Sequence, residues 1–96
     1  MMKVWKFSLD TKVMMPLSAK ILTVGGQGDD LFVWALVNPD ERMVEHTFLI
    51  VGTGHAIPDE QFDPVSQVPK FAGTIFLHDR QLVIHVWEVA TLVWKE

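Results

Sequence analysis

The fold is decided by Leu31-Phe32-Val33-Trp34-Ala35-Leu36-Val37, an apolar run that ends at the turn signal Asn38-Pro39-Asp40-Glu41. The run is continuous rather than alternating, as expected of a strand whose two faces are both covered. Proline presets its own φ for a turn, so the chain should turn at Pro39. The segment from Glu45 to Val51 then returns as a second strand.

Short segments of the same kind continue to both ends of the chain. The first one alternates, with Trp5, Phe7 and Leu9 on one face and Lys6 and Ser8 on the other. No segment holds a helical period over ten or more residues. The expected strands are residues 4–9, 12–15, 19–24, 31–37, 45–51, 71–77 and 82–89, with 91–94 extending the last strand or forming another. Residues 1–96 are therefore predicted to be a single all-β domain, a small antiparallel β-sandwich or barrel built from hairpins, with one long loop.

Strand 31–37 is apolar on both faces, and the same holds for residues 48–51 and for strand 82–89 apart from His85 and Glu88. An antiparallel sheet with one wet face should alternate instead, and a chain of 96 residues can hardly cover both faces by itself. We therefore expect a homo-oligomer in which Trp34 and Trp87 fill the core or a subunit interface. The alternative is a closed barrel that leaves some apolar side chains exposed.

Composition restricts the possible partners. The chain has a formal net charge of −4 and no cysteine, and its eight Lys and Arg residues are scattered singly. Proteins that bind a nucleic-acid duplex usually cluster their basic residues, so a duplex is not expected as a partner. No window reaches the roughly 18 apolar residues that a membrane helix needs, and the N-terminus lacks the apolar core of a signal peptide. We expect a cytoplasmic protein without disulfides, membrane contact or a thiol-based site.

The clearest hint of a site is the turn Gly52-Thr53-Gly54-His55, which follows an apolar strand. Two glycines around one hydroxyl let successive backbone amides point the same way, an arrangement that suits an anion. The turn also opens a long segment, 53–70, that has no strand pattern, and loops of this length are usually functional or disordered. We expect Gly52, Thr53, Gly54 and His55 to contact a small anion, with charge supplied by Lys70 or Arg80. The alternative is a tight turn in which His55 only caps a carbonyl.

The other histidines give weaker signals. None has a second ligand-type residue at metal-binding spacing, so neither a metal nor another cofactor is expected. His85 lies inside the last apolar strand, where a buried imidazole held by a carbonyl or carboxylate is commoner than a ligand. Nothing places a nucleophile on a strained turn, so no catalytic residue is assigned and the protein is not expected to be an enzyme.

Several segments together resemble a family of small bacteriophage and prophage proteins known only as a domain of unknown function. The segments are Val4-Trp5-Lys6-Phe7, Met15-Pro16, Ala19-Lys20-Ile21-Leu22, Gln27, Trp34-Ala35-Leu36-Val37-Asn38-Pro39, Gly52-Thr53-Gly54-His55, Ile57-Pro58, Gly73-Thr74 and His85-Val86-Trp87-Glu88. The stretch from Pro58 to Phe71 is longer than is typical of that family, and the tail from Val89 continues past its usual end. The resemblance implies a phage origin, with residence in the host cytoplasm, and no activity.

Three functions follow as hypotheses. The first is a non-catalytic accessory protein that sequesters a small anionic, nucleotide-derived signalling molecule of host defence as a homo-oligomer. The second is a protein-interaction module that inhibits a host protein or takes part in phage assembly. The third is a small hydrolase that uses His55, with Thr53 or Ser66 as its nucleophile.

Overall fold

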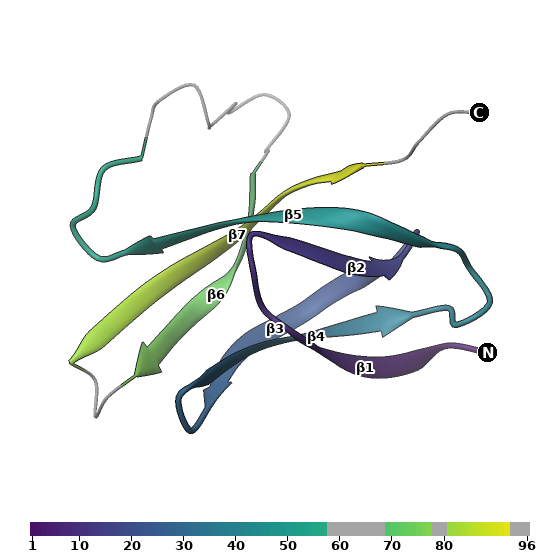
Figure 1. Ribbon diagram of the computed structural model, residues 1–96, viewed down its shortest axis with the longest axis horizontal. Coiled ribbons are helices and arrows are strands. Elements are labelled where there is room, and N and C mark those ends of the chain that lie inside the picture. The colour runs from purple at the N-terminus through teal and green to yellow at the C-terminus, as the bar shows by residue number, and fades with distance from the viewer. Residues whose placement is uncertain (58–68, 78–80, 93–96) are drawn as a thin grey trace.

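The computed structural model describes residues 1–57, 69–77 and 81–92, and every regular element among them is a β-strand (Figure 1). The seven strands are β1 (Lys3–Ser8), β2 (Lys12–Pro16), β3 (Lys20–Gln27), β4 (Asp30–Val37), β5 (Met43–Gly52), β6 (Lys70–Leu77) and β7 (Leu82–Leu92). The all-β prediction is confirmed, and β7 runs on to Leu92 as one continuous strand. The remainder of the long loop, residues 58–68, lies outside the described residues.

The strands form two antiparallel sheets rather than a closed barrel. The three-stranded sheet has the order β1-β4-β3, and the four-stranded sheet has the order β2-β5-β7-β6. Only β3-β4 and β6-β7 are pairs of consecutive strands, with Gln27 opposite Asp30 and Leu77 opposite Leu82. The turn at Pro39 is therefore not a hairpin, because it carries the chain from β4 in one sheet to β5 in the other.

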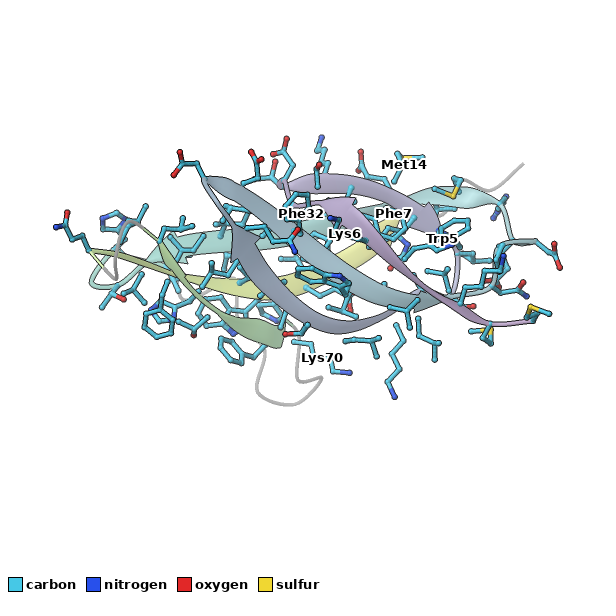
Figure 2. The ribbon with its side chains drawn as sticks, turned by 90° about the horizontal axis from the view of Figure 1, so that it is seen from below. Trp5, Lys6, Phe7, Met14, Phe32 and Lys70 are labelled. Carbon is cyan, nitrogen blue, oxygen red and sulfur yellow. The ribbon has the colours of Figure 1, made fainter. Side chains whose placement is uncertain are left out.

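The two sheets pack face to face around an aliphatic core. Alternate residues point inward from each strand, as the period of a β-strand requires. Trp5 and Phe7, expected on one face of β1, both pack against this core, and Figure 2 shows them along that strand. The fully or nearly buried apolar side chains are Val13, Met15, Val24, Val33, Ala35, Val37, Val44, Phe48, Ile75, Leu77, Ile84 and Val86.

One side of the sandwich is closed by β3 against β6, which lie side by side in Figure 1. Gly73 sits in a bulge of β6 with a φ of 155°, and a Cβ built there would lie 2.9 Å from Val24 Cγ2 on β3. Both the backbone conformation and the close approach require glycine at this position.

The core also holds a polar side chain, His46 of β5, which is 1% exposed. Its Nε2 lies 3.1 Å from the Pro16 carbonyl oxygen, and its Nδ1 lies 3.1 Å from Thr91 Oγ1. The Glu88 carboxylate is 3.8 Å from the same Nδ1. Because a carbonyl only accepts, Nε2 carries a hydrogen, and in a neutral ring Nδ1 would then accept from the Thr91 hydroxyl. The ring therefore joins β2, β5 and β7 inside the sandwich.

The outer face of the three-stranded sheet is partly covered by the chain itself. The Lys6 amine lies 4.5 Å from the centre of the Phe32 ring and donates a hydrogen bond of 3.1 Å to Gln27 Oε1 (Figure 2). Trp34 lies over Gly25, where an added Cβ would be 3.3 Å from Trp34 Cζ3. Trp34 is half-buried on this outer face, so the core position considered for it is wrong.

Candidate functional site

The glycine-rich turn leaves the end of β5 as a closed backbone turn. The His55 amide donates to the Gly52 carbonyl oxygen at 3.1 Å, and Gly54 has a φ of 84°, a conformation that favours glycine. The Thr53 amide donates to the carbonyl oxygen of Val83 at 3.1 Å. This amide, expected to point at an anion, is thus already hydrogen-bonded to β7. The polar side chains of the turn therefore matter more for any ligand than the Thr53 amide.

The hydroxyl of Thr53 makes the decisive contact. Thr53 Oγ1 lies 2.7 Å from Nε2 of His85 on β7, and Thr74 Oγ1 on β6 lies 3.0 Å from Nδ1 of the same ring. His85 is half-buried and Thr53 is exposed. We call these three side chains the hydroxyl–imidazole cluster. His85 was expected to be buried against a carbonyl or carboxylate, and that expectation is wrong for both its burial and its partners.

The cluster lies on the outer face of the four-stranded sheet. In the register, His85 is opposite Val51 on β5 and Thr74 on β6, while Trp87 is opposite Leu49 and Phe71. The β5–β7–β6 face, as we name it, consists of Leu49, Val51, Phe71, Thr74, Phe76, Val83, His85 and Trp87. None of these eight side chains carries a carboxylate, an ammonium or a guanidinium group.

Aromatic rings flank the cluster on this face. Phe71 and Trp87 meet edge to face at 5.3 Å between ring centres, and the Trp87 ring centre is 6.3 Å from that of His85. Phe71 is 54% exposed and Phe76 is 59% exposed, so two large rings face outward near a polar centre. Trp87 is half-buried on this face and does not belong to the core. Rings beside hydroxyls and an imidazole suit a planar heterocycle that carries polar groups.

His55 lies beside the cluster rather than in it. Its ring packs over Gly52, where an added Cβ would lie 3.0 Å from Cε1 of the ring, and the side chain is exposed. The position leaves the imidazole available at the rim of the β5–β7–β6 face.

The predicted basic residues do not join the turn in the part of the chain that can be described. Lys70 begins β6 opposite Glu88 of β7, whereas Gly52 is opposite Ile84. Glu88 and Ile84 are four positions apart, which corresponds to about 13 Å along the strand. The register of Lys70 places it on the same side of the sheet as Glu88, which faces His46 in the core. Figure 2 shows Lys70 exposed near the start of β6. Arg80 lies outside the described residues.

Two residues of the cluster, Thr74 and His85, were missed as site residues from the sequence. One signal could have found them. Leu77 pairs with Leu82, and counting outward by three residues from each pairs Thr74 with His85. Alternation along β7 then places His85 on the same face as Val83 and Trp87.

The described ranges 1–57, 69–77 and 81–92 contain no group of three His, Asp or Glu side chains that could hold a metal ion. Nor do these ranges include a helix long and apolar enough to cross a membrane.

A family model for a domain of unknown function, DUF7352, matches residues 1–95 of the chain. The chain belongs to this family. The match runs through residue 95, so the tail after Val89, which we expected to pass the usual end of the related proteins, is within the family's length. No match was found among curated proteins or among solved structures. The family membership assigns no activity, so a function can be inferred only from the β5–β7–β6 face and the adjoining turn.

Proposed function

We propose that the protein is a non-catalytic binding protein that holds a small anionic, nucleotide-derived ligand on the β5–β7–β6 face beside the Gly52–His55 turn. The observation that carries this proposal is the 2.7 Å contact between Thr53 Oγ1 and His85 Nε2. This contact joins the hydroxyl of the turn to His85, whose ring centre lies 6.3 Å from that of Trp87. Bases stack on such rings, and hydroxyls and imidazoles bind phosphates.

The finer part of the proposal is a phage-type protein that sequesters a signalling molecule of host defence. It is supported by the sequence resemblance described above and by a candidate site that has polar and aromatic groups but no assigned nucleophile. Genes for phage structural or replication proteins beside members of this family would support it. Consistent placement among housekeeping genes would contradict it.

The ligand proposal is tested first by native mass spectrometry of the purified protein. A discrete extra mass that is released on denaturation, and whose spectrum is that of a nucleotide, would support it. The next experiment is titration of a nucleotide panel into the wild type and His85→Ala, with Thr23→Val on β3 as a matched control. Binding should weaken at least tenfold in His85→Ala only, and steady conversion of a nucleotide into products would contradict a non-catalytic role.

The same face supports self-association, the second part of the proposal. Phe71 and Phe76 are more than half exposed, and the face carries no full charge although the chain has a net charge of −4. Two copies can therefore meet there without bringing like charges together. Light scattering after gel filtration should report an oligomer for the wild type and a monomer for Phe76→Glu. A monomeric wild type would remove this part and leave the face to a different protein partner, the second candidate function.

A further inference from the structure

The hydrogen-bonding capacity of the hydroxyl–imidazole cluster depends on the charge of its histidine. A neutral imidazole has one N–H donor and one acceptor nitrogen. With threonine hydroxyls at both nitrogens, one hydroxyl must donate to the ring and the other must accept from it. Only the accepting hydroxyl then keeps its hydrogen for a ligand.

Protonation changes this arrangement. Both ring nitrogens of an imidazolium donate, so Thr53 and Thr74 would both accept from His85. Neither hydroxyl would then give its hydrogen to the ring, and the ring between them would carry a positive charge. The Thr53 hydroxyl also lies 3.5 Å from the Val83 carbonyl oxygen, a long contact that a bound oxyanion would replace as its acceptor. Two donors on either side of a cation form a binding site for an oxyanion. With a neutral ring, the cluster offers one donor and no charge.

Within residues 1–57, 69–77 and 81–92, the surroundings of His85 supply no competing anion. The neighbours of His85 on the same face are Val51 and Leu49 from β5, Phe71 and Phe76 from β6, and Val83 and Trp87 from β7, and none of them ionises. Among the described residues, the carboxylate of Glu88 and the amine of Lys70 are on the opposite side of the sheet. The nearest titratable neighbour on the turn is His55, whose ring packs on Gly52. Within the described ranges, a charge on His85 would thus have no carboxylate as its counterion, and an anionic ligand would supply one.

We propose that the hydroxyl–imidazole cluster binds a phosphate-type oxyanion together with a proton, which His85 takes up as the anion enters. The inference rests on the proposed function and assigns the binding of the ligand's anionic group to Thr53, His85 and Thr74. Binding should weaken as the pH rises, because each bound anion takes up one proton and the proton concentration falls.

The test is calorimetric titration with 3′,5′-cyclic AMP at about pH 5.5, 6.5 and 7.5, the range in which histidine titrates. A phosphodiester probe keeps one negative charge throughout, so its own titration does not contribute. Repeating each titration in two buffers of different ionisation enthalpy gives the number of protons taken up. We expect an affinity loss that approaches about tenfold per pH unit at the upper end, and an uptake that approaches one proton per ligand.

Matched variants assign the proton. His85→Gln should bind weakly with no proton uptake and no pH dependence, whereas His55→Gln should keep both. Thr53→Val and Thr74→Val should each weaken binding at the lowest pH. Thr53→Ser, which keeps the hydroxyl, should bind as the wild type does, and Thr23→Val should have no effect. Urea unfolding of each variant identifies any loss that comes from misfolding.

The outcomes separate the two proposals. Binding of cyclic AMP with the same affinity at all three pH values and no proton uptake overturns the coupling but leaves the proposed function intact. Uptake that is lost in His55→Gln and kept in His85→Gln also overturns it. Absence of binding by both cyclic AMP and inorganic sulfate at every pH overturns the proposed function and the coupling together.

Discussion

His46 and His85 lie on opposite faces of the same four-stranded sheet, and their partners differ in one respect. Each ring has a threonine hydroxyl at Nδ1, Thr91 for His46 and Thr74 for His85. At Nε2, His46 meets the carbonyl oxygen of Pro16, while His85 meets a second hydroxyl. A carbonyl can only accept, so it fixes the tautomer of His46. A hydroxyl can donate or accept, so the partners of His85 allow either tautomer, although donation from Thr53 to the ring gives up its 3.5 Å contact with the Val83 carbonyl oxygen.

The difference indicates what each residue does for the protein. His46 is fully buried and joins three strands through partners that allow one arrangement, which is how a polar residue stabilises a core. His85 is half-buried beside the Trp87 ring, and its hydroxyl partners can either donate to a ring nitrogen or accept from it when the ring gains or loses a proton. A group whose hydrogen bonds survive a change of charge is suited to bind a ligand.

The largest expected effect is on stability, and it separates the two histidines. His46→Ala should lower the free energy of unfolding by about 3 kcal/mol, because it leaves a cavity and removes the partners of Pro16 and Thr91. His85→Ala should lower it by less than about 1 kcal/mol, because its hydroxyl partners can turn to water. Urea unfolding followed by tryptophan fluorescence measures both. Equal losses would show that His85 is a structural residue and would break the comparison.

The strands themselves could be predicted from the sequence, because each is a short apolar segment that ends at glycine, proline or a polar turn. The sheet to which a strand belongs could not. The sequence of the turn at Pro39 does not show whether β5 pairs with β4 in a hairpin or crosses to the other sheet. In the structure it crosses, and β5 pairs with β2 and β7, which are distant from it in sequence. The order β2-β5-β7-β6 therefore needed the structure.

The site was predicted only in part. The turn Gly52–His55 was identified, but the contact from Thr53 to His85 spans 32 positions, and no local pattern encodes it. The buried histidine was expected at position 85, inside the last apolar strand, whereas it is His46. Alternation would have placed His46 inward with Val44 and Phe48. The polar neighbours Glu45 and Thr47 obscured this pattern, although they belong to the other face of β5.

A smaller effect is expected from the threonines that serve the two rings. Thr91→Val should cost about 1 kcal/mol, because the buried Nδ1 of His46 loses its hydroxyl partner. Thr74→Val should cost less than half of that, since the His85 ring is partly solvated and can take the other tautomer. The two valine variants have the same shape and differ only in the histidine that they affect. A larger loss in Thr74→Val would contradict the adaptable role given to His85.

The smallest effect concerns only which nitrogen of each imidazole carries the hydrogen, and it is measured on the wild type without a change in stability. At a pH where both rings are neutral, nitrogen NMR of the imidazoles should find His46 as the Nε2–H tautomer, because the Pro16 carbonyl accepts only from a hydrogen on that nitrogen. His85 should show averaged nitrogen shifts from two tautomers that exchange as the hydroxyls of Thr53 and Thr74 reverse direction. Thr53→Val leaves Thr74 as the remaining hydroxyl partner, and its hydroxyl can still donate or accept at Nδ1. The shifts of His85 should therefore change in that variant while those of His46 stay the same. A single tautomer for His85 in the wild type would mean that its hydroxyls are locked, and the two histidines would then differ in burial but not in adaptability.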